Sequence, residues 1–122
     1  KKYRKEVILV LSNPVFQFTP QSCSSKDRPI TFSFGKPCRI PVKIFREDQA
    51  RNWYNSIIEQ LASLYDNVSV VDASSEFCDD EFCYMEKDGA MLYRDQGHLN
   101  VAGSRLVGRE IMRIIDNSKE WK

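Results

Sequence analysis

Two short apolar runs rich in β-branched residues, Val7 to Leu11 and Val68 to Asp72, most constrain the fold of this chain. Each run is continuous rather than alternating, which is typical of strands buried on both faces of a parallel sheet. Between them, residues 47 to 66 carry apolar side chains at helical spacing. A strand, a helix and a strand in this order form a βαβ unit, so we expect parallel strands joined by a right-handed crossover.

The apolar face of the helix over 47–66 is expected to belong to the core. Its members recur at helical spacing, and two of them are tyrosines. They are Trp53, Tyr54, Ile57, Ile58, Leu61, Leu64 and Tyr65. Glu47 and Asp48 suit the positive N-terminal end of a helix. A ligand-binding aromatic platform is the alternative interpretation of this stripe.

The only histidine, His98, follows Asp95 by three residues in the run Tyr93-Arg94-Asp95-Gln96-Gly97-His98-Leu99-Asn100. In a tight turn both side chains can point into one cleft. A carboxylate bonded to one imidazole nitrogen fixes the tautomer and the ring, so that the other nitrogen can take a proton from a hydroxyl nucleophile. The spacing alone is also compatible with a solvated histidine in a surface turn.

A second helix is predicted from Val101 to about Asn117, with Asn100 as its N-cap. Its apolar face comprises Leu106, Val107, Ile111, Ile114 and Ile115. Gly103 near its start would allow a neighbouring backbone to approach closely. The stretch from Gly103 to Gly108 lacks the Lys-Ser/Thr ending of a phosphate-binding loop. No cofactor is expected.

The remaining segments are predicted to be loops and a hairpin. Residues 15 to 45 are rich in proline and phenylalanine and are expected to form an irregular, packed excursion, with an edge strand at Ile30 to Phe34. This excursion is interpreted either as an acceptor-binding insertion or as a stapled surface loop. Tyr84–Met85 and Ala90–Tyr93 flank Lys87-Asp88-Gly89, which predicts a short hairpin.

Four cysteines, Cys23, Cys38, Cys78 and Cys83, lie in loop-like sequence. We expect two local disulfides, Cys23–Cys38 and Cys78–Cys83, which would indicate an oxidising compartment such as the periplasm or cell exterior. A four-cysteine zinc site is an alternative, although the paired C-x2-C knuckles of such sites are lacking, and free thiols are another. The acidic run 79–81 lacks the EF-hand pattern, so we expect solvation there rather than a bound metal.

Composition sets the size and the class of partner. At 122 residues the chain is one domain or part of one, and its net charge of +1 gives no electrostatic case for nucleic-acid binding. No run approaches 18 apolar residues, so no membrane helix is expected, and no signal peptide is visible.

The block Leu92-Tyr93-x-Asp95-x-x-His98-Leu99-Asn100-x-x-Gly103 resembles the last conserved block of the SGNH hydrolase superfamily. More narrowly, it resembles the SGNH domain fused to the acyltransferase-3 family of polysaccharide O-acyltransferases, with Asn100 in place of the usual serine. The pair Cys78 and Cys83 also looks like that group, as does the first strand running into Asn13-Pro14. The resemblance implies the C-terminal half of an α/β, parallel-sheet, three-layer domain of the SGNH or flavodoxin-like type.

The superfamily's serine nucleophile lies in a Gly-Asp-Ser turn, and its oxyanion donors include a glycine and an Asn-Asp block. The sequence contains no G-D-S, no G-x-N-D and no G-x-S-x-G motif. Ser12 lacks the glycine-flanked turn that exposes such a serine and is interpreted as structural. The chain would therefore carry the base, His98, and the residue that orients it, Asp95, without the nucleophile.

The resemblance implies an O-acyltransferase or esterase that moves an acyl group, expected to be acetyl, from a donor to a cell-surface glycan. The expected partners are the acyl donor, the glycan acceptor, and the N-terminal half or membrane domain of a parent protein anchored in the inner membrane. This chain alone is expected to be inactive. A non-catalytic, disulfide-stapled module that binds a glycan or a protein is the alternative, and two copies could pair through an exposed sheet edge.

Overall fold

The computed structural model describes residues 5–23 and 37–117. Along the chain the elements are β1 (Val7–Val10), α1 (Pro20–Cys23), β2 (Arg39–Pro41), α2 (Val42–Arg46), α3 (Gln49–Leu64), β3 (Val68–Val71), the 3-10 helix η2 (Ser74–Glu76), β4 (Phe82–Tyr84), β5 (Glu86–Lys87), β6 (Ala90–Met91) and α4 (Val101–Asn117). The chain is thus of mixed α/β type. No helix in the described part is long and apolar enough to cross a bilayer.

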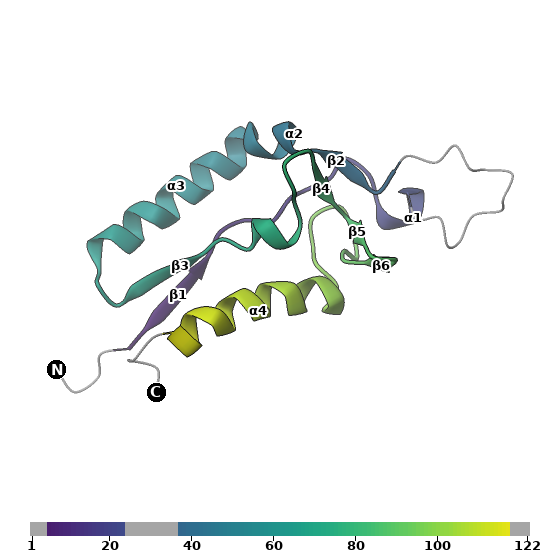
Figure 1. Cartoon of the computed structure of the whole chain (residues 1–122). Helices are drawn as coiled ribbons and strands as arrows, with labels where there is room; N and C mark the ends of the chain where they lie inside the picture. The colour runs from purple at the N-terminus through teal and green to yellow at the C-terminus, as the bar shows by residue number, and fades with distance from the viewer. Residues whose placement is uncertain (1–4, 24–36, 118–122) are drawn as a thin grey trace, which may run out of the picture.

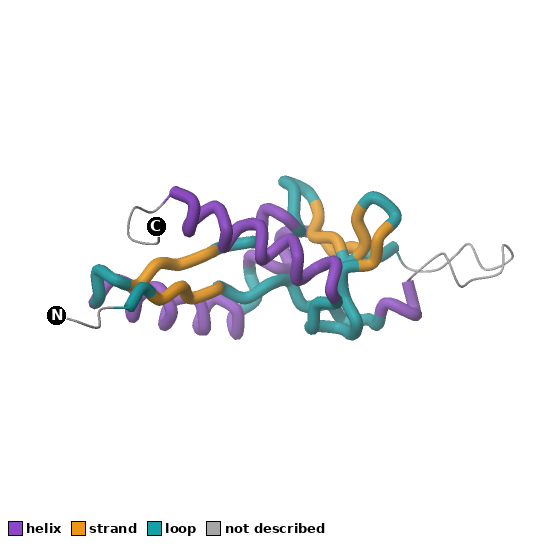
Figure 2. The backbone as a smooth tube through the Cα atoms, turned by 90° about the horizontal axis from the view of Figure 1, so that it is seen from below, coloured by secondary structure: helices purple, strands orange, loops and turns teal. Residues whose placement is uncertain are grey.

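The predicted βαβ unit is confirmed. Strands β1 and β3 are parallel, with Val7 opposite Val68 and Val10 opposite Val71. Helix α3 lies on one side of this strand pair and α4 on the other (Figures 1 and 2). The expectation of burial on both faces holds only in part, because Val71 is buried whereas Val7 is 40% exposed.

Helix α3 begins where the sequence indicates, since the side chain of Asp48 accepts a hydrogen bond from the Arg51 N–H at 3.1 Å. Its apolar stripe, however, is not in the core: Trp53 is 68% exposed and Leu64 is 71% exposed. The prediction of a buried stripe was wrong because periodicity identifies an apolar face without identifying what covers it.

The side of α3 that meets the rest of the molecule carries a polar contact. Asn55 is 8% exposed, and its Oδ1 accepts a hydrogen bond from the Ser12 N–H at 3.1 Å. This bond fixes the backbone immediately after β1 to the middle of the helix. The stripe that contains Trp53 and Leu64 faces solvent in the described part of the chain.

The small sheets form the other end of the molecule (Figures 1 and 2). Strands β2 and β4 are antiparallel, and β5 and β6 form the predicted hairpin. At its tip Asp88 and Gly89 both have positive φ, 54° and 79°, as a two-residue hairpin turn requires. Residues 15 to 45 are less irregular than expected, because α1, β2 and α2 lie within them; the expected strand at 30–34 lies outside the described residues.

Both local disulfides form, with Cα–Cα distances of 5.1 Å for Cys23–Cys38 and 3.9 Å for Cys78–Cys83. No cysteine is free, so the zinc and free-thiol alternatives do not apply. The two bridges lie within or beside the main buried cluster, whose least exposed members are Phe16, Phe77, Cys83, Met85 and Tyr93. The core therefore lies under the loops and small sheets rather than under α3.

Helix α4 is attached closely at its first turn, as predicted for Gly103. A Cβ atom built on Gly103 would collide with the carbonyl oxygen of Leu92 and reach 3.0 Å from the Leu99 side chain. Only a residue without a side chain permits this approach. The backbone just after β6 and the backbone of the first turn of α4 are therefore in direct contact.

Candidate catalytic site

Asp95 organises the turn that follows it. Its Oδ1 accepts hydrogen bonds from the Gly97 N–H at 2.9 Å and the His98 N–H at 2.7 Å. These two backbone bonds are the main reason why the pKa of Asp95 is lowered from 3.8 to about 2. The carboxylate therefore stays ionised at neutral pH, and the turn is ordered by the side chain that faces the imidazole.

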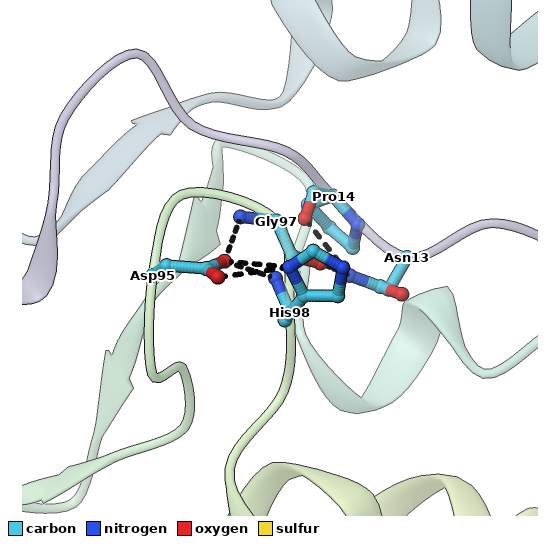
Figure 3. Close-up of polar contacts among 5 residues, drawn as sticks. All are labelled: Asn13, Pro14, Asp95, Gly97 and His98. Atoms are coloured by element: carbon cyan, nitrogen blue, oxygen red, sulfur yellow. Dashed lines mark hydrogen bonds and ion pairs between the residues drawn. The ribbon is translucent and has the colours of Figure 1, made fainter.

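His98 places one ring nitrogen against this carboxylate. Nδ1 lies 2.8 Å from Asp95 Oδ2 and 3.0 Å from Asp95 Oδ1 (Figure 3). With an ionised carboxylate as partner, Nδ1 carries the hydrogen and Nε2 is left as the basic nitrogen. Within residues 5–23 and 37–117 no group bonds to Nε2, and the side chain is 70% exposed. The pair has the geometry of an oriented general base with an open position.

The loop after β1 holds the same turn from the opposite side. Asn13 Nδ2 donates to the Gly97 carbonyl at 3.2 Å and to the Pro14 carbonyl at 3.1 Å (Figure 3). The Phe16 N–H donates to the Gln96 carbonyl at 2.8 Å. The turn is thus held by residues 80 or more positions earlier in the sequence.

Tyr93 connects the loop after β1 to the His98 turn. It is 1% exposed, its hydroxyl donates to the Pro14 carbonyl at 2.6 Å and accepts from Asn13 Nδ2 at 3.3 Å. Burial raises the pKa of Tyr93, so the phenol stays protonated. Its ring packs edge-on against Phe16 and Phe77, at centroid distances of 5.0 and 6.0 Å.

Asn100 connects the turn to α4 and acts as the predicted N-cap. Its Oδ1 accepts from the Gly103 N–H at 2.9 Å, and its Nδ2 donates to the Met91 carbonyl at 2.7 Å. Its own N–H donates to the Leu92 carbonyl at 3.0 Å. Asn100 stands where the block it resembles usually has serine, and it keeps the capping role. Its side-chain N–H adds a hydrogen bond to the end of β6.

A cavity of about 310 Å³ lies at the carboxyl ends of β1 and β3. The lining residues include Ser12 and Asn13 after β1, Ser74 after β3, and Leu99 beside His98. This is the edge at which parallel α/β sheets bind ligands. The Ser12 hydroxyl is buried without a hydrogen-bond partner in the described part of the chain, and no described serine bonds to His98.

The acidic residues elsewhere have local structural roles. The side chain of Asp72 accepts a hydrogen bond from the Ser74 N–H and so caps the loop after β3. Asp79 accepts from the Tyr84 hydroxyl at 2.6 Å and from two backbone N–H groups, and these bonds lower its pKa to about 2. Among the described residues, no group of three or more potential ligands could hold a metal ion.

Asn13 was not recognised as a site residue from the sequence, and Tyr93 was noted only as part of a motif. The signal for Asn13 is its place directly before a proline at the end of a strand, where turn geometry directs an amide toward neighbouring carbonyls. For Tyr93 the signal is a tyrosine two residues before the aspartate of the motif, alternating with the exposed Arg94.

Of the comparisons with known proteins, the one with family models gives a match. No curated protein and no solved structure matches the chain significantly. The family model described as "SGNH domain (fused to AT3 domains)" matches residues 1–113, which include the Asp95–His98 turn and most of α4. The chain therefore belongs to the family of SGNH domains that are fused to acyltransferase-3 domains.

Proposed function

We propose that this chain is the base-bearing part of an SGNH-type O-acyltransferase or esterase acting on a cell-surface glycan outside the cytoplasm. Family membership supports a hydrolase-like domain associated with acyl transfer. The observation that carries the proposal is the contact of His98 Nδ1 with Asp95 at 2.8 Å, combined with an Nε2 to which no described residue is hydrogen-bonded.

In the proposed reaction a serine hydroxyl attacks the carbonyl carbon of the acyl donor, while His98 Nε2 takes the hydroxyl proton. The imidazolium then gives this proton to the leaving group as the bond between the acyl carbon and that group breaks. In the second half, a glycan hydroxyl attacks the acyl-serine, with His98 again as base and then as acid. Asp95 holds the ring and stabilises its charged form throughout.

The nucleophile and the oxyanion donors are proposed to come from outside residues 1–122. The chain contains no Gly-Asp-Ser turn, and no described serine contacts the imidazole. Within the described residues β1 pairs only with β3, so one edge of β1 is free beside the loop that holds the His98 turn. A further parallel strand along this edge would end next to His98 and complete a three-layer domain.

The test uses the parent protein and a fluorophosphonate probe, with mass mapping of the labelled peptide. We expect labelling of one serine outside this chain, sharply reduced in His98→Ala and reduced in Asp95→Asn. Asp80→Asn is the matched control, since Asp80 is exposed and its carboxylate makes no hydrogen bond or ion pair in the described part of the chain, and it should label as wild type. Labelling that is indifferent to His98 would refute the proposed role.

A binding module without chemistry is the second candidate. The exposed aromatic residues of α3, Trp53 and Tyr54 at 68% and 42%, favour it because aromatic faces bind sugars and proteins. In that case no serine would be labelled in any variant. Ligand binding by the parent would fall in Trp53→Ala and would survive His98→Ala.

A further inference from the structure

A shallow groove of about 660 Å³ begins at the His98 turn and follows the first two turns of α4. Arg94 and Arg105 line it, with Leu99, Val101 and Ser104 between them. The Arg94 N–H donates to the His98 carbonyl at 2.9 Å, so this arginine belongs to the same turn as the imidazole. The groove and the proposed base are therefore built on the same turn.

Among the described residues, the two arginines are the only charged ones that line this groove. Neither guanidinium has an ion pair or hydrogen bond to any residue in the described ranges. Further along α4 the pattern differs: Arg109 bonds to Glu76 at 3.2 Å, and Arg113 pairs with Glu110. The positive N-terminal end of α4 adds to the field in the groove. Next to the proposed site, two guanidinium groups thus have no carboxylate partner among the described residues.

Resting on the proposed function, we infer that this groove binds a carboxylate or phosphate group of the glycan acceptor. A planar guanidinium pairs with either oxyanion through two parallel N–H bonds. Leu99 and Val101 supply apolar surface for the C–H face of a sugar ring, and the Ser104 hydroxyl can bond to a ring substituent. An acceptor hydroxyl near the bound anion would then lie beside His98.

The test measures the Kd of the parent protein for three oligosaccharides of equal length by isothermal titration calorimetry. One carries uronic acids, one carries phosphate, and one is neutral. We expect an anionic glycan to bind at least about tenfold more tightly than the neutral one, with an advantage that falls as salt is added. Arg94→Gln and Arg105→Gln should each weaken anionic binding about tenfold, as loss of a charge-assisted hydrogen bond does.

Matched variants separate charge from folding. Arg94→Lys and Arg105→Lys keep the charge and should retain part of the preference. Arg46→Gln removes an exposed arginine that does not line the groove, and its Kd values should stay within about twofold of wild type. Whichever anionic glycan has the lower Kd identifies whether the groove selects a carboxylate or a phosphate.

Equal Kd values for anionic and neutral glycans, or unchanged binding in both Arg→Gln variants, would overturn this inference. Such a result combined with His98-dependent labelling by the fluorophosphonate would leave the proposed function standing. Anionic preference that depends on the arginines, without serine labelling, would instead support the groove and refute the acyl-transfer chemistry.

Discussion

Helices α3 and α4 have nearly the same length, 16 and 17 residues, and both are amphipathic. The apolar side chains of α4 pack against the buried cluster, and Val101 and Met112 are its exposed large hydrophobic residues. Helix α3 exposes Trp53 and Leu64 by about two-thirds or more. The same sequence pattern thus gives a covered helix in one place and an uncovered one in the other.

The difference lies in what each helix faces. Both helices contact β3, but α4 also packs against the buried cluster that contains Tyr93 and the disulfide-bonded cysteines, and its first turn meets the backbone of Leu92. Helix α3 meets β3 and the chain after β1, and the side chain that it buries there is Asn55. The first turn of α4 is therefore covered by residues of this chain, whereas the α3 stripe has no covering neighbour among the described residues.

The largest expected effect tests the attachment of α4. Gly103→Ala places a Cβ against the Leu92 carbonyl and should lower the free energy of unfolding of the parent by about 3 kcal/mol. Gly108→Ala, on the same helix with nothing within 4 Å of the added Cβ, should raise it by about 0.5–1 kcal/mol. Denaturant midpoints measure both, and equal shifts would mean that α4 is not tightly attached at its first turn.

The second prediction tests whether α3 is covered in the parent. Leu64→Ala should then cost about 2 kcal/mol, the usual result for a buried leucine, despite the 71% exposure of this residue in the chain. Met112→Ala on α4, which is 51% exposed, serves as the control and should cost less than about 0.5 kcal/mol. If both cost equally little, the α3 stripe is a true surface and the binding-module function gains support.

The third prediction concerns the bond between the two loops at the site. Tyr93→Phe removes the buried hydroxyl that donates to the Pro14 carbonyl and accepts from Asn13 Nδ2. It should destabilise the parent by about 1 kcal/mol, because the Asn13 bonds to Pro14 and Gly97 remain. Tyr84→Phe removes an exposed phenol–carboxylate bond and should cost less. Thermal denaturation compares the two variants, and a larger loss for Tyr84→Phe would contradict the assigned role of Tyr93.

The smallest expected effect is the response of the His98 turn to acid. The pKa of Asp95 is lowered from 3.8 to about 2, so its stabilising contribution is complete above pH 3.8 and is lost as the pH falls through about 2. The amide shifts of Gly97 and His98 should therefore change in that acidic window. Asp95→Asn should abolish the transition, and a transition that persists in this variant would assign it to another group.

Much of the local structure was predictable from sequence because local rules determine it. The parallel strands, both long helices, the Asn100 cap and the Asp88-Gly89 turn follow from periodicity, capping and turn chemistry. The two disulfides follow from local pairing of cysteines in loop-like sequence. The contact of Asp95 with His98 also follows from a three-residue spacing in a tight turn.

The rest depends on contacts between segments far apart in the sequence. Asn13 reaches Gly97 across 84 positions, and no local pattern indicates this bond. The pairing of β2 with β4 likewise joins segments far apart in the sequence, with Arg39 opposite Tyr84 and Pro41 opposite Phe82. The exposure of the α3 stripe was mispredicted because amphipathicity reports the preference of a face and not the presence of a neighbour.

The attachment of α4 at its first turn also has a mechanical consequence. A helix of 17 residues is about 25 Å long, and here its pivot lies at Asn100 and Gly103, next to the imidazole. A tilt of about 5° around that pivot displaces the far end by about 2 Å but moves groups at the pivot by a small fraction of this distance. The geometry of the Asp95–His98 pair is thereby insulated from movement at the distal end of its own supporting helix.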